Sequence, residues 1–176
     1  MSRRSKSIIE TPRLILREFT LDDAYKIWEL NSDQEVIKYT GDPPFESVEK
    51  AREFLLNYKD YKKNGCGRWA VITKSSDSFI GWCGLKLNEQ NLIDIGFRFF
   101  RREWNKGYAT EAAYACLEYG FMDLNLKEII GRVATENISS IKVLEKLSMV
   151  FWKRDSCKGI DNSLYYRITK EQYLKN

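Results

Sequence analysis

The residues best suited to chemistry lie in one short stretch, residues 101–111 (RREWNKGYATE), which joins a strand-like run to a helix-like run. A strand that ends in a turn with a glycine and then enters a helix leaves several backbone N–H groups free at one point. The helix dipole adds partial positive charge there. Lys106, Arg101 and Arg102 add full charges. We therefore predict an anion site, with a phosphate or pyrophosphate as its ligand.

The stretch follows neither of two common phosphate loops. Gly107 has no partner glycine at the spacing of a Walker loop, and the glycine pattern of a dinucleotide-binding fingerprint is absent. A single glycine in a loop is a weak signal. The alternative interpretation is an ordinary turn between a strand and a helix, with a solvated basic rim.

The composition limits which side chains can act as acids, bases or metal ligands. The chain has no histidine, which excludes a histidine-based triad and leaves acid–base work to Asp, Glu, Tyr, Ser, Cys or Lys. Its four cysteines include no close pair. We therefore expect no metal site and interpret the cysteines as reduced, structural thiols of a cytoplasmic protein.

Length and charge are those of one globular domain. The 176 residues are 43% hydrophobic and 31% charged, and we expect a single domain over 1–176 with a flexible tail at 1–7. No apolar run approaches the ~18 residues of a membrane helix, and no signal-peptide core follows the basic start. The net charge of +4 is spread among 25 acidic residues, so we expect a small anionic ligand and no direct contact with nucleic acid.

Periodicity predicts the elements that position the anion site. The first half reads as a strand at 11–19, a helix from Thr20 to about 31, a helical turn at 34–39 and a longer helix at 47–63. Strands at 68–74, 78–87 and 92–100 follow, joined by short polar turns that favour an antiparallel meander. In the last of these, Asp94, Gly96 and Arg98 share one face, and a glycine there indicates a bulge or a backbone that a ligand approaches closely.

The second half predicts a helix at 108–122, a strand at 127–134, a helix capped by Asn137 that runs to 147, and closing strands at 150–154 and 164–169. The fold class is therefore α/β (α+β). We expect a mixed, mostly antiparallel, twisted sheet of about seven strands flanked by about four helices, with one parallel crossover through the helix at 108–122.

Three stretches, in order, resemble the GNAT acetyltransferases: 94–97 (DIGF), 104–112 (WNKGYATEA) and 136–147 (ENISSIKVLEKL). The opening at 11–17 (TPRLILR) is similar to the first strand of the RimJ/RimL group, the ribosomal-protein N-terminal acetyltransferases. The resemblance covers nearly the whole chain. It implies a GNAT fold in which acetyl-CoA lies in a V-shaped opening where the strands at 92–100 and 127–134 splay apart.

The resemblance also implies roles for individual residues. The pyrophosphate loop falls on 105–110, and the pantetheine arm meets the backbone near 97–99. Asn137 contacts the cofactor, and Ser140 lies near the thioester sulfur. The cofactor-binding residues that we predict are Phe97, Arg98, Phe99, Arg102, Asn105, Lys106, Gly107, Tyr108, Ala109, Thr110, Asn137 and Ser140.

Three departures from the family pattern stand out. Asn105 replaces a glycine of the loop, which puts a side chain beside one backbone N–H. Ser148 stands where relatives have glycine, and a left-handed backbone there costs serine about 1 kcal/mol relative to glycine. No tyrosine lies between Asn137 and Leu147, so the general acid that many relatives carry on this helix is unassigned.

The chemistry of acetyl transfer to an amine suggests the remaining roles. An α-amine of pKa near 8 is about a tenth neutral at pH 7, whereas a lysine amine near 10.4 is neutral at only about 0.04%. A protein N-terminus therefore needs only a weak base, and Asp94, through a water, is our candidate; the alternative is an acid at a strand surface. Ser140 is our candidate for contact with the sulfur; the alternative is a capping bond in the first turn.

The reaction that the resemblance implies is the transfer of acetyl from acetyl-CoA to a primary amine, with a ribosomal-protein or other peptide N-terminus as the expected acceptor. A polyamine or aminoglycoside is the alternative acceptor. Two further classes stay open: a CoA-binding adaptor without turnover, and a nucleic-acid or ribosome-binding module. We expect no membrane partner and either a monomer or a homodimer. Steep salt dependence of RNA binding would favour the nucleic-acid class.

Overall fold

The computed structural model describes residues 6–175. The first half of the chain contains β1 (Ser7–Glu10), β2 (Leu14–Arg17), α1 (Ala24–Ser32), α2 (Gln34–Ile37), α3 (Val48–Leu56), α4 (Asp60–Asn64), β3 (Arg68–Thr73) and β4 (Ser78–Leu87). The second half contains β5 (Ile93–Phe99), α5 (Tyr108–Met122), β6 (Glu128–Val133), α6 (Ile138–Lys146), β7 (Val150–Cys157), β8 (Ile160–Thr169) and α7 (Lys170–Lys175). Short 3₁₀ turns at Leu21–Asp23 and Arg101–Glu103 precede α1 and follow β5.

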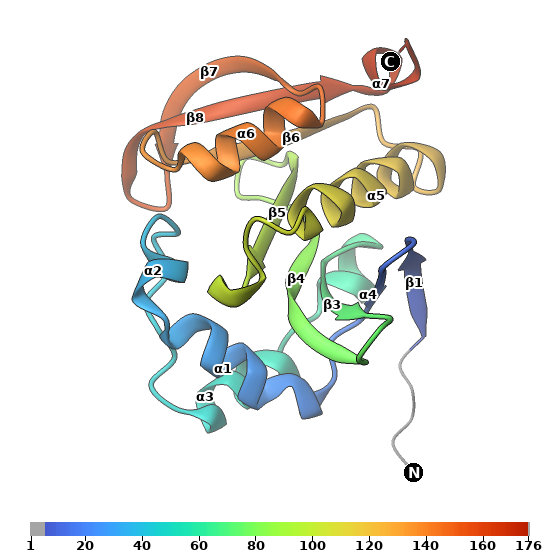
Figure 1. Ribbon diagram of the computed structural model, residues 1–176. Coiled ribbons are helices and arrows are strands. Elements are labelled where there is room, and N and C mark those ends of the chain that lie inside the picture. Colours follow the sequence, from blue (N-terminus) through green and yellow to red (C-terminus); the bar gives the residue numbers. More distant parts are fainter. Residues whose placement is uncertain (1–5, 176) are drawn as a thin grey trace.

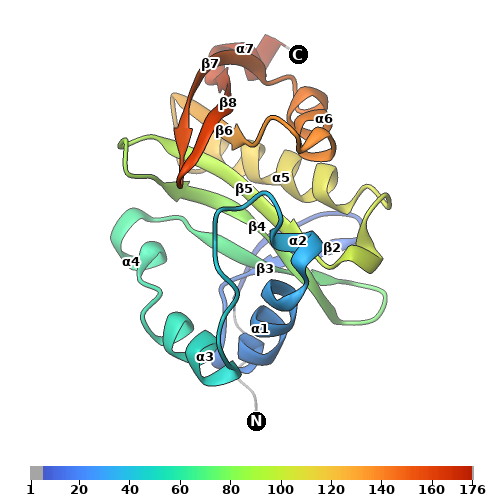
Figure 2. The ribbon, with the colours of Figure 1, turned by 90° about the vertical axis from the view of Figure 1, so that its left-hand side faces the viewer.

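All the strands belong to one sheet of eight strands in the order β1-β2-β3-β4-β5-β6-β8-β7. Only β5 and β6 pair in parallel within the described sheet, and α5 connects them. Figures 1 and 2 show α1, α3 and α4 on one face of the sheet and α5 and α6 on the other. The predicted mixed α/β fold and its parallel crossover are therefore confirmed.

Each face of the sheet has its own apolar core. Trp69, Cys83, Ile95 and Phe99 pack with α5 and α6, whereas Ala70, Ile72, Phe79 and Phe100 pack with α1 and α3. The strict alternation along β5 explains this division, because every second side chain points to the same face. It also places Asp94, Gly96 and Arg98 on the face that α1 and α3 cover.

The sheet opens between β5 and β6. The two strands pair only at Asp94 with Ile130 and at Ile95 with Gly131, while β5 continues to Phe99. Beyond Ile95 the strands therefore diverge, and the backbone of β5 loses its neighbour on that side. The splay that the family resemblance implied between 92–100 and 127–134 is confirmed.

Several predicted boundaries were wrong. Ser7, placed in a flexible tail, begins β1, which adds an eighth strand to the sheet of about seven that we expected; residues 1–5 of that tail lie outside the described residues. The predicted helix at 47–63 is two helices, because the side chain of Asn57 donates to the Glu53 carbonyl (2.9 Å) and ends α3. The closing strands are longer than predicted, and α7 was missed.

Two predictions about special residues hold. Ser148 has a φ of 61°, so it does occupy the left-handed position that glycine favours after a helix. Cys66, Cys83 and Cys116 are buried and free, and the Sγ atoms of Cys83 and Cys116 lie 3.7 Å apart in the core between β4 and α5. Burial raises the pKa of the Cys116 thiol well above its ordinary value, which suits an inert structural role.

Candidate active site

The start of α5 presents a row of free backbone donors. Gly107, the residue before the helix, has a φ of 79°, and Asn105 has a φ of 60°. The first helical bond of the segment runs from the Glu111 N–H to the Gly107 carbonyl. Within residues 6–175, no acceptor reaches the N–H groups of 105–110. Asparagine tolerates a left-handed backbone better than most residues, so Asn105 fits this loop in place of glycine.

A polar clamp that the sequence analysis missed fixes this helix start. The Glu111 carboxylate accepts bonds from the Thr11 hydroxyl (2.6 Å), the Arg13 N–H (3.1 Å) and Arg13 Nε (2.6 Å). Arg13 Nη1 donates to the Lys106 carbonyl (2.9 Å), and its guanidinium lies 4.5 Å from the Tyr108 ring centre. Burial works against the charge of Glu111, but these bonds outweigh it and lower the pKa of its carboxyl. The turn between β1 and β2 thus holds the loop in place.

The cations predicted to add charge at the loop are exposed and already paired. Lys106 Nζ lies 2.9 Å from Glu103, Arg101 lies 3.4 Å from Asp33, and Arg102 lies 3.7 Å from Glu29 and from Glu103. Exposed pairs of this kind contribute little and can rearrange around a ligand. The backbone amides are therefore the firmer part of the predicted anion site.

A cavity of about 640 Å³ passes through the splay in the sheet. Its walls include Phe19, Ile27 and Phe45 on the α1 and α3 side, and Asn137, Ser140 and Leu144 from α6 on the other side. Its middle is lined by residues on the two sides of the gap: Gly96 and Phe97 on β5, and Val133 and Ala134 at the end of β6. One space therefore connects the two faces of the sheet at the point where the strands part.

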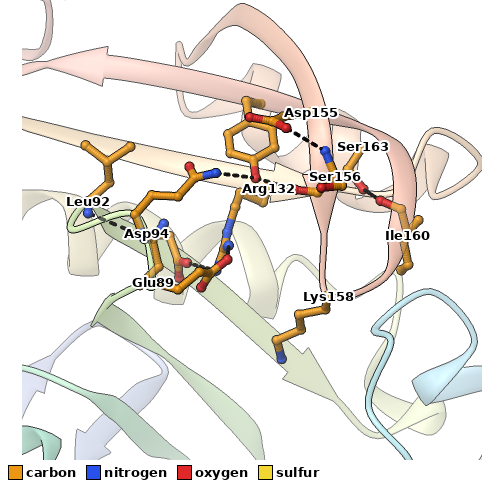
Figure 3. A network of polar contacts seen from close by, with 12 residues as sticks. Glu89, Leu92, Asp94, Arg132, Asp155, Ser156, Lys158, Ile160 and Ser163 are labelled. Carbon is orange, nitrogen blue, oxygen red and sulfur yellow. Dashed lines mark hydrogen bonds and ion pairs between the residues drawn. The ribbon is translucent and has the colours of Figure 1, made fainter.

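A chain of ion pairs crosses the base of this cavity. Asp94, 3% exposed, accepts Arg68 on one carboxylate oxygen and Arg132 on the other, both at 2.5 Å. Arg132 also donates to Glu89 at 2.5 Å, and Figure 3 shows the side chains of Glu89, Asp94 and Arg132 converging. Burial opposes the charge of Arg132, but the nearby charges of Asp94 and Glu89 outweigh it and raise the pKa of its guanidinium. Both Asp94 oxygens are thus occupied by cations.

Gly96 makes room for one of these cations. A Cβ at position 96 would lie 2.6 Å from the Arg68 guanidinium carbon, so the guanidinium lies flat over the backbone of β5. Arg68 also donates to the carbonyls of Gly84 (2.6 Å) and Asp94 (3.0 Å). The sequence indicated a bulge or a closely approaching ligand at this glycine; the neighbour is instead an arginine of β3.

Comparison with known proteins decides the family. A profile described as "Acetyltransferase (GNAT) domain" matches residues 13–150. The chain belongs to the GNAT acetyltransferases. It is 39% identical over 141 residues to an uncharacterized N-acetyltransferase, p20, of Bacillus licheniformis, covering 78% of this chain and 79% of the relative.

Two solved structures have folds similar to that of this GNAT chain. A GNAT-family acetyltransferase from Bacillus anthracis superposes with a TM-score of 0.76 at 32% identity, covering 93% of this chain and 98% of that one. A spermidine N-acetyltransferase from Vibrio cholerae, in complex with CoA and spermine, superposes with a TM-score of 0.78 at 23% identity, covering 93% and 99%. The protein is therefore an acyltransferase with acetyl-CoA as its cosubstrate, and no group within the described residues has the composition of a metal site.

Some of the other predicted cofactor residues line the cavity, and others point away from it. Phe97 lines the cavity, but Phe99 packs in the core, and the Arg98 side chain turns to Asn31 (2.5 Å) and Asp42 (2.8 Å) on the opposite side. Only the backbone of 98–99 is therefore left for a cofactor. Asn137 caps α6 by accepting the Ser140 N–H at 3.2 Å, and both residues line the cavity.

No helix within the described part of the chain is long and apolar enough to cross a membrane.

Proposed function

We propose that this GNAT enzyme acetylates the α-amine at the N-terminus of a peptide or protein, as the RimJ/RimL group does. The observation that supports this most directly is the single cavity through the sheet. The donor enters from the side of α5 and α6, and the acceptor enters from the side of α1 and α3. The two reactants then meet where β5 and β6 part, which holds the reacting atoms together before the reaction starts.

The donor lies along elements that the described residues supply. The pyrophosphate binds to the amides of 105–110 at the start of α5, and the exposed Lys106 and Arg102 contribute from the rim. The pantetheine arm runs along the unpaired backbone of 97–99. The Ser140 side chain makes no hydrogen bond to another described residue, so its hydroxyl is available to the thioester sulfur. Asn137 holds the first turn of α6 in place.

The reaction then needs little acid–base help. The amine nitrogen attacks the thioester carbon, the carbon–sulfur bond breaks, and the proton that the amine loses passes to the departing thiolate. An α-amine of pKa near 8 is about a tenth neutral at pH 7 before any help from the site.

The role of Asp94 as base stays a prediction, and the geometry favours a different one. Its two oxygens accept from Arg68 and Arg132 at 2.5 Å and the residue is only 3% exposed, so the carboxylate is directed at two guanidinium groups and is nearly closed to water. We propose instead that Asp94 is a positioning residue that holds the two guanidinium groups at the base of the cavity. A polyamine is the second candidate acceptor, because one similar fold is a spermidine N-acetyltransferase.

An acceptor screen tests the proposal. Purified protein and acetyl-CoA are mixed with amidated tetrapeptides bearing a free N-terminus, with spermidine, and with an aminoglycoside, and thiol release is followed. We expect turnover with the peptides and none with N-terminally acetylated controls. Turnover with spermidine alone would overturn the peptide proposal. CoA binding in calorimetry without turnover on any acceptor would support an adaptor.

A further inference from the structure

The walls of the cavity carry an excess of positive charge. Its charged lining residues are the cations Arg68, Lys86, Arg98, Arg132 and Lys158 and the carboxylates Asp42, Glu89 and Asp94. Five cations face three carboxylates, whereas the cleft of an enzyme that binds a polycation needs free carboxylates. The sign of the lining therefore bears directly on the acceptor.

Each of the three carboxylates is already neutralised. Asp94 accepts from two arginines, and Glu89 accepts from Arg132. Asp42 accepts from Arg98 at 2.8 Å and from Lys158 at 2.7 Å. Burial would raise the pKa of Asp42, but these two partners outweigh it and lower that pKa. An approaching ammonium group finds no unpaired carboxylate in the lining.

Two side chains at the end of β4, those of Lys86 and Asn88, carry hydrogen-bond donors that are not all paired with acceptors. Lys86 shares the face of Asp94, is 43% exposed, and has one partner, Asp60, at 3.4 Å. The neighbouring Asn88 accepts the N–H groups of Gln90 (2.9 Å) and Leu92 (3.0 Å) on its Oδ1, which fixes the orientation of the amide. Its Nδ2 is buried and has no partner among the described residues. A buried donor in this position calls for an acceptor.

Aromatic rings lie beside the cations of the lining. Lys86 Nζ lies 5.9 Å from the Tyr58 ring centre, and the guanidinium groups of Arg68 and Arg98 lie 5.5 Å and 5.2 Å from the Trp82 ring centre. Tyr58 and Trp82 also line the cavity. A ligand at Lys86 and Asn88 would thus meet aromatic rings as well as charged groups on its way to the splay.

We propose that the acceptor is a peptide whose N-terminal segment carries an acidic side chain, and that Lys86 and Asn88 bind that carboxylate. The proposal rests on the proposed transfer to an α-amine and adds the charge of the acceptor. Lys86 supplies the opposite charge, and Asn88 supplies the directed N–H. The cation-rich wall also repels the second and third ammonium groups of a polyamine, so the same surface selects for the acid and against the polycation.

The test compares amidated peptides that differ at one residue: Ala-Asp-Ala-Phe, Ala-Asn-Ala-Phe and Ala-Lys-Ala-Phe. We expect kcat/KM for the Asp peptide to exceed that for the Asn peptide about fivefold and that for the Lys peptide about tenfold or more, as for a partly exposed charge pair. High salt should reduce both ratios. Equal values for the three peptides would overturn this inference and leave the proposed function standing.

Substitutions of Lys86 and Asn88 test whether these residues cause the preference for the Asp peptide. Lys86→Met keeps the aliphatic stem and should lower the Asp/Asn ratio about fivefold, and Asn88→Leu should lower it as well. Lys175→Met removes the same charge from the distant α7 and should leave the ratio as it is. Thermal melting and CoA calorimetry show that each variant is folded. A Lys86→Met ratio equal to that of the parent would overturn the assignment of this subsite.

A last set of acceptors, amines that are not peptides, distinguishes the peptide acceptor from the carboxylate subsite. Free glutamate and 4-aminobutyrate carry an amine and a carboxylate but no peptide. If these are acetylated and the peptides are not, the peptide acceptor of both proposals fails, and only the assignment of Lys86 and Asn88 to a carboxylate stands. If spermidine is preferred to every anionic amine, both proposals fail.

Discussion

The two ends of the cavity are built from different parts of the polypeptide. At the donor end, the binding groups are backbone amides at 105–110, where residues 105–107 are exposed and residues 108–110 are half-buried. At the acceptor end, the binding groups are side chains, several of them buried, held in a network of ion pairs. A common donor needs one backbone shape, whereas an acceptor that differs between enzymes needs side chains that can change.

The largest effect should come from cutting the network at the acceptor end. Asp94→Asn leaves two nearly buried guanidinium groups without their carboxylate, and removing one partner of a buried pair typically costs about 3–5 kcal/mol. We expect the free energy of unfolding to fall by about 3 kcal/mol. Turnover should fall more than the KM for acetyl-CoA rises. Chemical denaturation and steady-state kinetics measure both.

A pH profile of the same variant decides between the two roles of Asp94. If Asp94 positions the arginines, kcat/KM falls at every pH and the profile keeps its shape. If it is the base, the same loss of stability accompanies the variant, but one limb of the kcat/KM profile disappears. Asp42→Asn, which also cuts a paired carboxylate of the lining, is the matched control for loss of stability.

The same contrast explains what the sequence could predict. The donor end is local: one glycine, the start of one helix and the asparagine cap of another stand in the order of the chain, so the loop and the cap could be found. The acceptor end joins distant segments. Arg68 and Asp94 are 26 positions apart, Arg132 and Asp94 are 38, and Lys158 and Asp42 are 116. Spacing alone gives no signal for such pairs.

Some errors have the same origin. Gly96 looked like a close approach of ligand to backbone, and the approach is real, but only the register of β3 against β4 and of β4 against β5 shows that Arg68 makes it. The Glu111 clamp likewise depends on β1 and β2 lying beside α5. The alternation along β5 needed no such knowledge, and it was predicted correctly.

The next effect should come from the backbone at the donor end. Gly107→Val forces a β-branched residue into a φ of 79°, which it adopts only with strain, so the loop should change shape. We expect CoA affinity to fall about tenfold or more, a loss of about 1.4 kcal/mol, while affinity for the acceptor changes little. Gly65→Val puts the same strain at a φ of 73°, at the end of α4, and should leave CoA binding intact. Calorimetry with CoA compares the three proteins, and equal losses in both variants would point to general destabilisation.

The smallest effect should come from a charge at the same loop. Lys106 is about half exposed, with its Nζ 2.9 Å from Glu103, so it gives up an existing partner to reach a phosphate. Exposed pairs are worth about 0–1 kcal/mol, and we expect Lys106→Ala to weaken CoA binding by no more than about threefold. The loss should shrink in high salt, whereas the loss in Gly107→Val should not, because it arises from backbone shape. A loss in Lys106→Ala as large as that in Gly107→Val would mean that side-chain charge, and not the row of amides, holds the pyrophosphate.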